Sequence, residues 1–442
     1  MPATVDPAAQ TDVIVIGGGP AGSTVATLLA KRGWRVALFE KERHPRFHIG
    51  ESLLPMNMPI IERLGLMDEL RAIGVKKVGA DFEARNERGY GTFEFSRALG
   101  DSPPYAFQVR RDEFDEMLFR DSAKHGVQAF ECARVSDVAF DGDGVTVTVA
   151  TPDGERPWRA KQLVDATGRD TFLASRFKLK RKHSKHQSAA LFAHFTGVER
   201  RKGEHEGNVS IYQFEHGWLW FIPLRNDVMS VGAVCWPEYL KRRQGRTAEF
   251  LLETIALVPA AQARMRDAKL VDHLHVTGNF SYVSSRMWGP RWLLAGDAFA
   301  FVDPVFSSGV FLAMHGAEKA AATLDEVLRD PATEARAKSR FDAEVRRGLE
   351  AFSWFIFRFT TPAMRRLFAN PRNAFGVEQA MISMLAGDVF DNPRVRSRLR
   401  IFKAIYYATA FRMFGSNLKH YFRRRRQLGE RFTGGTTTQD HA

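Results

Sequence analysis

Alternating apolar and polar positions divide the chain into an α/β part, a β-rich middle and a helical end. Residues 11–42 read as a buried apolar strand, a glycine turn, an amphipathic helix and a second strand. Apolar strands ending in further glycine turns return at 162–170 and at 291–324, where the strand runs into a long helix. These late returns predict an α/β fold with a Rossmann-like domain whose sheet is assembled from distant segments.

The middle of the chain has the period of two that is typical of strands. Residues 130–168 alternate around the turns DGDG and PDG, which predicts a β-meander. Several strand-like runs follow, and the pattern after residue 331 is helical. The expected order is the first part of the α/β domain at 1–185 with 78–104 contributing to the substrate side, an antiparallel substrate domain at 186–285, a return segment of the α/β domain at 286–330 and a basic helical region at 331–442.

Composition narrows the class of protein. The sequence has no uncharged apolar stretch of roughly eighteen residues, and its polar start fits neither a secretory signal nor a transit peptide. Cys132 and Cys235 lie far apart and outside any metal-binding spacing, so we expect a reducing cytoplasm and no metal site. The net charge of +13 points to anionic partners, but no nucleic-acid-binding motif accompanies it.

The first strand, turn and helix carry a nucleotide-binding pattern. Gly17, Gly19 and Gly22 occupy the glycine positions of GxGxxG, with Ala21 in the same turn, and Glu40 ends the second strand. Glycines permit the tight turn, the close approach of a pyrophosphate and helix–strand packing, and an acid at the second strand hydrogen-bonds a ribose. This block predicts dinucleotide binding.

Later segments indicate which dinucleotide is bound. Arg111 lies in QVRRDEFD, and Gly296 and Asp297 follow the returning strand. Together with GxGxxG these segments resemble the FAD-binding pattern of the flavoprotein monooxygenase superfamily, in which the arginine and the GD pair contact FAD. A second GxGxxG is absent from the sequence. The resemblance therefore implies FAD whose reduced form comes from a separate flavin reductase.

Two tryptophans stand one residue apart in a short apolar run. In an extended strand Trp218, Trp220 and Ile222 share one face and Leu219 and Phe221 the other, and burial in a core is the simpler interpretation of that spacing. The run WLWFIP, however, fits WxWxIP, the hallmark of the flavin-dependent halogenases of the tryptophan halogenase-like family. The segments FHIGESLLP and FVDPVFSSGV resemble two further segments of that family.

The resemblance implies a two-site mechanism. Reduced FAD, O2 and chloride or bromide give hypohalous acid beside the flavin, and this oxidant moves through a tunnel to a lysine next to an electron-rich substrate. Trp218 and Trp220 would then separate the flavin from the substrate, which prevents direct hydroxylation.

The lysine must be chosen from a neighbouring pair. Val78, Ala80 and Phe82 alternate as a buried strand face, and this periodicity puts Lys76 in phase with them and Lys77 on the other face. The K-x-G-A spacing of the family selects Lys77 instead. A surface lysine pair is the simpler interpretation of the residues alone.

Ser307, Ser308 and Gly309 directly precede a long helix. The free N–H groups and the dipole of a helix N-terminus attract anions, although the serines could equally be helix caps. By resemblance, the amides of Ser308 and Gly309 would hold the halide, and Gly309 would also contact FAD.

One position departs from the family pattern. Halogenases of free tryptophan carry a glutamate two residues before the pair matched by Ser308 and Gly309, and this chain has Phe306 there. This resembles the branch that acts on phenols, pyrroles or carrier-tethered acyl groups, and the resemblance implies a substrate that is a small aromatic or is bound to an acyl carrier protein. An FAD-dependent hydroxylase and a reductase similar to geranylgeranyl reductases remain alternatives, since they share every cofactor residue.

Residues 392–432 interleave arginine and lysine with aromatics. Helical spacing predicts an apolar stripe bordered by cations, formed by Phe402, Tyr406 and Phe411 with Arg398, Lys403 and Arg412. A helix packed on the catalytic body is one interpretation. The other is a docking surface for an acidic carrier protein or for an anionic membrane.

Overall fold

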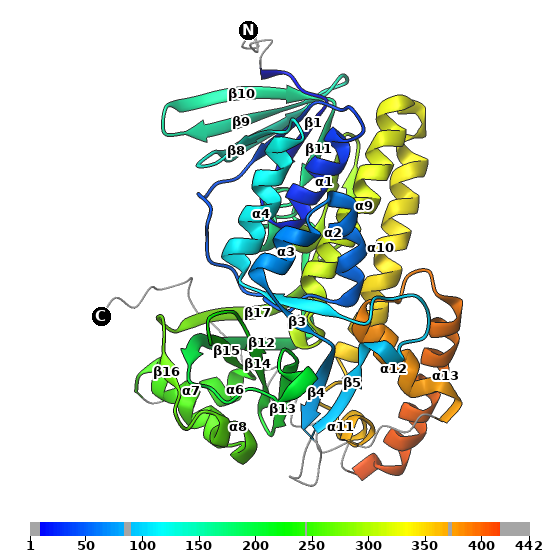
Figure 1. Ribbon diagram of the computed structural model, residues 1–442. Coiled ribbons are helices and arrows are strands. Elements are labelled where there is room, and N and C mark those ends of the chain that lie inside the picture. The colour runs from blue at the N-terminus through cyan, green and yellow to red at the C-terminus, as the bar shows by residue number, and fades with distance from the viewer. Residues whose placement is uncertain (1–8, 84–89, 244, 370–373, 416–442) are drawn as a thin grey trace.

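The computed structural model describes residues 9–83, 90–243, 245–369 and 374–415 (Figure 1). A six-stranded sheet lies in its upper half. Its strands are β1 (Val13–Ile16), β2 (Val36–Phe39), β7 (Gln128–Phe130), β11 (Gln162–Asp165), β18 (Trp288–Gly289) and β19 (Trp292–Leu294). They follow the order β18-β19-β11-β1-β2-β7, and all neighbours are parallel except the edge pair β18–β19. The predicted Rossmann-like sheet with late returns is therefore confirmed.

Helices and a small sheet pack on these strands. The helices are α1 (Pro20–Ala30), α4 (Arg111–Lys124), α9 (Ser308–Arg329) and α10 (Glu334–Ile356). Helix α1 contacts both α4 and α9, and α10 packs on α9. The predicted β-meander forms a three-stranded antiparallel sheet of β8 (Arg134–Phe140), β9 (Val145–Thr151) and β10 (Gly154–Ala160). Its Trp158 packs edge-on against Phe39 and Phe130, with ring centroids 5.2 Å from each.

A second large sheet forms the lower half. Its strands are β4 (Gly79–Glu83), β5 (Tyr90–Glu94), β12 (Lys180–Thr196), β13 (Val209–Phe214), β14 (Gly217–Pro223), β15 (Met229–Cys235), β16 (Lys269–Leu270), β17 (His275–Ser284) and β20 (Ala300–Phe301). The order is β20-β17-β12-β15-β14-β13-β4-β5, with β16 paired to β12.

This second sheet differs from the prediction in two ways. It is mixed rather than purely antiparallel, because β4 arrives from the segment 78–104 and pairs in parallel with β13. The expected boundary at residue 185 also falls inside a strand, since β12 already begins at Lys180. The basic run at the start of this strand hid it from a search for apolar alternation.

Strand β14 has two different faces, as its period of two predicts. Trp218, Trp220 and Ile222 belong to the main core, whereas Leu219 and Phe221 belong to a separate core on the other face of the sheet. That separate core includes residues of α7 (Thr247–Ala256) and α8 (Pro259–Arg264), which follow the short α6 (Pro237–Leu240). The whole strand is buried.

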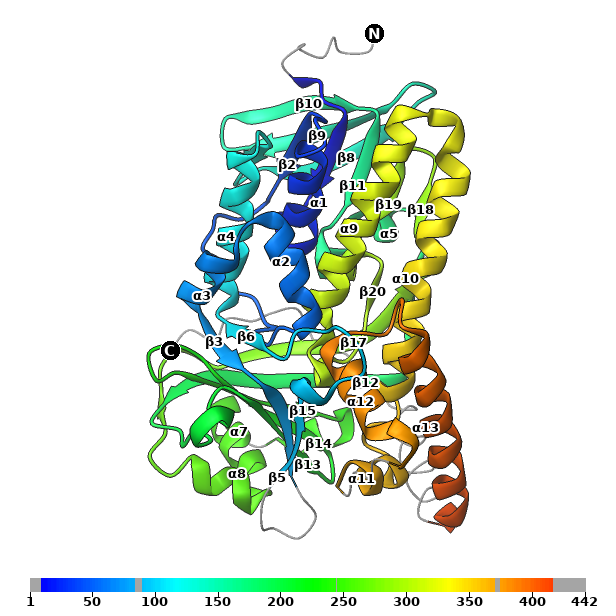
Figure 2. The ribbon, with the colours of Figure 1, turned by 45° about the vertical axis from the view of Figure 1, so that its right-hand side comes forward.

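Short elements join the two halves, and helices complete the chain. The connecting elements are α2 (Met58–Leu64), α3 (Met67–Ile73), β3 (Gly74–Lys77), β6 (Ala106–Val109) and α5 (Phe172–Arg176), and the last helices are α11 (Pro362–Ala369), α12 (Val377–Ala386) and α13 (Pro393–Arg412). Figure 2 shows α13 at the outer edge of the lower half, below α10. Among the described residues, no helix is both long and apolar enough to cross a membrane.

The predicted stripe on α13 is only partly correct. Phe402 and Tyr406 are buried, and both rings lie against Trp354. Phe411 is 80% exposed, because at about 100° per residue it is turned about 180° away from Phe402. The arginine run at 423–426 lies outside the described residues.

Candidate active site

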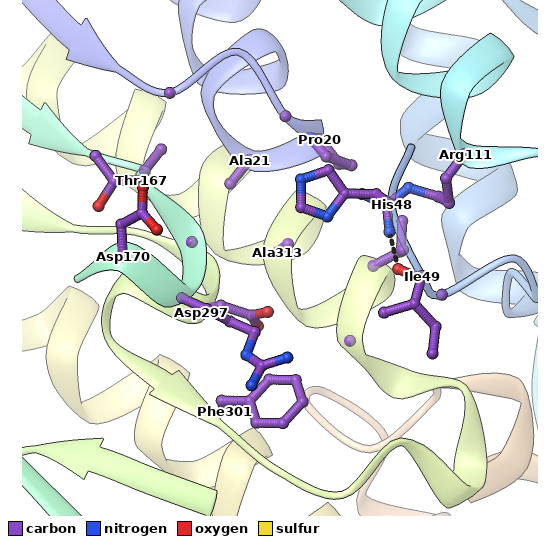
Figure 3. Close-up of a pocket in the computed structure, with 18 of the residues that line it drawn as sticks. Pro20, Ala21, His48, Ile49, Arg111, Thr167, Asp170, Asp297, Phe301 and Ala313 are labelled. Atoms are coloured by element: carbon purple, nitrogen blue, oxygen red, sulfur yellow. Dashed lines mark hydrogen bonds between the residues drawn. The ribbon is translucent and has the colours of Figure 1, made fainter. Parts of the chain in front are cut away.

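A cavity of about 780 Å³ lies where the two halves meet, and residues from both line it. Figure 3 shows Arg111 and His48 on one side of this cavity and Thr167, Asp170 and Asp297 on the other. Nine of the twelve residues to which the sequence analysis gives a role at the site line the cavity: Gly17, Gly19, Ala21, Glu40, Arg111, Trp218, Trp220, Asp297 and Gly309. The lining does not include Gly22, Lys77 or Ser308.

The glycine turn at the start of α1 cannot hold larger residues. Gly17 has φ +101°, and a Cβ there would lie 2.4 Å from the carbonyl oxygen of Ala166. A Cβ on Gly22 would lie 1.8 Å from the carbonyl oxygen of Gly17. Gly22 therefore packs against the turn itself and does not line the cavity. The nearest atom to a Cβ on Gly19 is 3.4 Å away, so this position faces open space toward the cavity. The turn thus has the shape that a pyrophosphate requires.

Glu40 is fixed at the end of β2. Its carboxylate accepts hydrogen bonds from the backbone N–H of Gly18 at 2.7 Å and of Glu42 at 2.9 Å. Arg46 lies 3.4 Å from the same carboxylate. These contacts hold the acid beside the glycine turn, where a ribose hydroxyl could reach it.

Arg111 organises the opposite wall. Its guanidinium donates two hydrogen bonds to Asp115, at 2.7 and 3.0 Å, and a third at 2.7 Å to the carbonyl oxygen of Ile49 (Figure 3). Burial of Asp297 raises the pKa of its carboxyl to about 6, although Arg169 and Arg111 counteract this. Burial, with Arg111 and Arg46 nearby, lowers the pKa of His48 to about 3. The wall therefore offers donors and acceptors to a polyol and a ring system.

The tryptophans form a rigid section of the cavity wall. Both side chains are 5% exposed, and their ring centroids lie 5.7 Å apart. The Trp220 indole donates a hydrogen bond to Ser230 Oγ at 3.2 Å. A Cβ on Gly232 would lie 2.2 Å from the Trp220 ring, so the neighbouring strand comes close only because it has glycine there.

Lys77 is fully enclosed, whereas Lys76 is exposed. Lys77 is 1% exposed, and its Nζ donates to Ser52 Oγ at 2.7 Å and lies 5.6 Å from the Phe95 ring centroid. Burial lowers the pKa of its amine to about 7. The periodicity argument that put Lys76 on the buried face is wrong, because the strand breaks at Val78 between β3 and β4 and the alternation restarts there.

The start of α9 also lies at the cavity. Ser307 has the left-handed φ of +55° and makes no capping hydrogen bond, so the capping interpretation finds no support at this residue. Ser307 and Gly309 line the cavity. Ser308 is fully buried, and its Oγ has no hydrogen-bond partner among the described residues.

Sequence reasoning did not assign roles to several residues at this site. Ser52 lines the cavity and holds Lys77, and Glu51 beside it lines the cavity and contacts His194. Both lie in FHIGESLLP, which attracted attention as a segment without any residue being singled out. A polar pair inside an otherwise apolar run was the available signal.

Comparisons with known proteins agree with this geometry. Residues 10–347 match the family model described as FAD binding domain. The chain is 37% identical to a tryptophan 2-halogenase of Chondromyces crocatus over 72% of this chain, and spans 62% of that enzyme's own length. It is 33% identical to flavin-dependent halogenase armH3 of Armillaria mellea over 79% of this chain and 73% of that protein.

A relative of similar size and two solved structures extend the likeness. The 1H-pyrrole-2-carbonyl-[peptidyl-carrier protein] chlorinase of Pseudomonas fluorescens is 28% identical over 87% of this chain and 90% of that enzyme. A flavoprotein/dehydrogenase of Cytophaga hutchinsonii superposes with TM-score 0.83 at 28% identity, covering 91% of this chain and 99% of that one. The myxobacterial chondrochloren halogenase CndH gives TM-score 0.73 at 32% identity, covering 92% and 97%.

Proposed function

Because the chain belongs to the flavin-dependent halogenases, we propose that it halogenates an electron-rich aromatic substrate with hypohalous acid delivered through Lys77. The observation that carries the proposal is a lysine amine at 1% exposure, held by a serine that itself lines the cavity. A structural lysine usually keeps its charged end in water, or pairs it with a carboxylate as the buried Lys338 does with Glu334, whereas the structure shows no such carboxylate for Lys77 among the described residues. This one is kept from water and can act as a neutral amine.

The cavity fits FAD. The pyrophosphate would lie against the glycine turn at Gly17 and Gly19, a ribose against Glu40, and the rest of the cofactor along Arg111 and Asp297. Reduced FAD supplies the two electrons that activate O2. The sequence holds a single nucleotide-binding motif, so a separate flavin reductase would deliver the cofactor in its reduced form.

The start of α9 would bind chloride or bromide. The N–H groups of Ser308 and Gly309 are the first of a long helix whose dipole favours an anion. The unpartnered hydroxyl of Ser308 is a further donor to such an ion. Gly309 lines the cavity, so a halide held here would lie beside the cofactor.

Phe306 gives information about the substrate. It is buried, and its ring packs against Phe359 at 5.3 Å and Phe368 at 6.1 Å. An apolar cluster at this position offers no carboxylate to take a proton from a weakly activated ring. The substrate is therefore a ring that loses its proton readily: a phenol, or a pyrrole carried by a peptidyl carrier protein, as in the name of the Pseudomonas fluorescens relative.

Halide-dependent products test the proposed function. Purified protein with FAD, a flavin reductase, NADH, O2 and bromide or chloride should add one halogen to a member of a panel of phenols and carrier-bound pyrroles. The isotope pattern of the halogen in mass spectrometry identifies the product. With the reductase left out, we expect no rapid loss of flavin absorbance on adding NAD(P)H. Rapid reduction by NAD(P)H alone would refute the dependence on a separate reductase.

A halide-independent FAD oxidoreductase is the second candidate function. It is favoured by the likeness to the solved structure called a flavoprotein/dehydrogenase. The same assay separates the two functions, because a hydroxylase or a double-bond reductase would give its product in halide-free buffer and with unchanged yield.

The basic C-terminal region would dock an acidic carrier protein. Helix α13 contains five arginines and one lysine and no acid in the described sequence PRVRSRLRIFKAIYYATAFR. Tyr407 and Phe411 are exposed among these cations. Carrier proteins that are strongly acidic would be attracted to this face, and more strongly at low salt.

Truncation after Asn417 tests the docking role. It removes the arginine run 423–426 and leaves α13 and every residue that lines the cavity in place. We expect the truncated protein to bind FAD and to halogenate a small free phenol normally, while its low-salt binding to an acidic carrier protein weakens at least about tenfold, since several charge contacts are lost. Pull-down at two salt concentrations measures this, and anionic vesicles report the membrane alternative. No binding by the full-length protein at low salt contradicts the docking role.

A further inference from the structure

Each halogenation takes up one proton along with the halide. This inference rests on the proposed function, whose balance is FADH2 + O2 + X⁻ + ArH + H⁺ → FAD + ArX + 2 H2O. The halide enters as an anion, and the product carries no charge from it. A proton must therefore reach the cavity once in every turnover, and an acidic group in the cavity lining is suited to deliver it.

Three charged side chains form a hydrogen-bonded row that starts at the cavity. Glu51 lines the cavity, and its Oε1 accepts from His194 Nε2 at 2.8 Å. The other ring nitrogen of His194, Nδ1, donates to Asp272 Oδ2 at 2.9 Å. Asp272 also accepts from the backbone N–H of His194 at 3.2 Å. The row links the loop before α2, strand β12 and the segment before β17.

Burial differs along the row. The side chains of Glu51 and His194 are each 3% exposed, whereas that of Asp272 is 27% exposed. A carboxylate and an imidazole in such a position cost stability unless each charge is paired. The row pairs them, and it leaves one end at the cavity and the other end near water.

Further charged groups surround the row. His275 lies 4.0 Å from Asp272 and stacks on Phe47 at 3.8 Å, and His273 packs beside it at 4.3 Å. Arg110 and Arg111 act on Glu51 from the start of α4. Burial by itself would lower the pKa of His194, but the hydrogen bonds to Asp272 and Glu51 outweigh it and raise that pKa to about 9. His194 is therefore protonated at neutral pH.

We propose that Glu51 is the acid that delivers this proton, and that His194, held charged by Asp272, stores it. In the step, the Nε2–H bond of the imidazolium breaks with its electron pair left on nitrogen, and an O–H bond forms on Glu51. The carboxyl then gives the proton to the oxygen atom of O2 that does not enter the hypohalous acid, and that atom leaves as the first of the two waters. After product release, a hydronium ion from the solvent returns a proton through Glu51 to Nε2 and is left as water, and the row is restored. Asp272 acts as a positioning residue, because it does not reach the cavity.

The row does not include Lys77, although Glu51 is next in sequence to Ser52, the hydrogen-bond partner of Lys77. Glu51 and Ser52 are consecutive, and adjacent side chains of an extended segment point in opposite directions. Glu51 meets His194, whereas Ser52 meets Lys77. Removing the stored proton would therefore slow the formation of the oxidant without displacing Lys77.

The variant Asp272→Asn tests whether His194 stores the proton, and two measurements report the result. The first is the titration of His194 by NMR on protein with ¹³C-labelled histidine, with the signal assigned through His194→Gln. The second is the pH profile of halide-dependent product formation under saturating reduced flavin. In the wild type we expect His194 to titrate near pH 9 and the rate to fall above that pH. In Asp272→Asn both midpoints should move down together by at least about one pH unit.

A matched variant and a second substitution complete the test. Asp121→Asn removes a mostly buried carboxylate of α4 that lies 3.6 Å from the ring of His125, away from the row, and should change neither the His194 midpoint nor that of the pH profile. Glu51→Gln keeps a partner for His194 but cannot carry a proton, so the rate should fall at least about tenfold with FAD binding retained.

Three results would count against the proposal. If the His194 midpoint moves in Asp272→Asn and the midpoint of the pH profile does not, the row has only a structural role, and His194 does not store the proton. If Glu51→Gln keeps the full rate, Glu51 is not the acid. If the wild type gives no halogenated product at any pH, the proposed function fails, and the NMR titration shows that the row itself is present or absent independently of that failure.

Discussion

Lys77→Met is expected to abolish halogenation of the substrate and at the same time to stabilise the protein. The activity is lost because the variant has no amine to receive the halogen, while formation of hypohalous acid, which precedes this step, continues. Trapping with monochlorodimedone measures the oxidant, and mass spectrometry measures the substrate product. Lys76→Met, on the exposed neighbour, should leave both unchanged. If Lys76→Met loses product and Lys77→Met keeps it, the choice of lysine is wrong.

The gain in stability follows from the burial of the amine. The pKa of Lys77 is about 7 in the folded chain and 10.5 in the unfolded chain. This difference costs on the order of 4 kcal/mol at pH 7.5, which the methionine side chain avoids. Ser52 lines the cavity, so water can replace its lost partner.

The pH dependence of this gain gives a second check. Between pH 7 and pH 10.5 the unfolded chain binds more protons at this lysine than the folded chain, so its contribution to the free energy of unfolding rises with pH in the wild type. The advantage of Lys77→Met should therefore be largest below pH 7 and disappear near pH 10.5. Urea denaturation across this range measures it. A constant difference, or none, contradicts a buried neutral amine.

The parts of the fold that depend on local pattern could be predicted. Gly17 and Gly22 occupy positions where a Cβ would collide with backbone, so steric necessity marks them in the sequence. The two faces of β14 follow from alternation alone. For Gly22 and for β14 the physical cause lies within a few residues of its effect, whereas the backbone that Gly17 approaches is that of Ala166.

Predictions failed where neighbours in space are distant in sequence. The choice between Lys76 and Lys77 depends on a break at Val78, which arises because β3 pairs with β6 whereas β4 pairs with β5 and β13. The contact of Glu51 with His194 joins residues 143 positions apart. Histidine in an apolar strand gives no sign of such a partner, and so the sequence contained the residues of the row without indicating that they meet.

The second large effect concerns the tryptophans. Trp218→Ala and Trp220→Ala should each destabilise the protein by about 3–5 kcal/mol, because each removes a large buried side chain. The double variant would then lose an amount comparable with the whole stability of a typical domain, which is about 5–15 kcal/mol. Single variants are therefore the ones to assay, with their melting temperatures recorded alongside.

A loss of stability alone does not show whether the tryptophans act as a barrier or only fill the core. The control variant must therefore remove an equally buried side chain. Phe221 lies on the same strand, is fully buried, and faces the other core against Tyr212. Phe221→Ala should cost a similar amount of stability, about 3–5 kcal/mol, without touching the cavity wall.

If the tryptophans retain the oxidant, each single tryptophan variant should raise the fraction of hypohalous acid trapped by monochlorodimedone relative to substrate product, and Phe221→Ala should not. Neither variant should hydroxylate the substrate, since the substrate would still have to reach the cofactor. An equal partition of oxidant in all three variants, at equal loss of melting temperature, would assign Trp218 and Trp220 to the core alone. The comparison is decisive because alternate residues of one strand face the cavity and the opposite core.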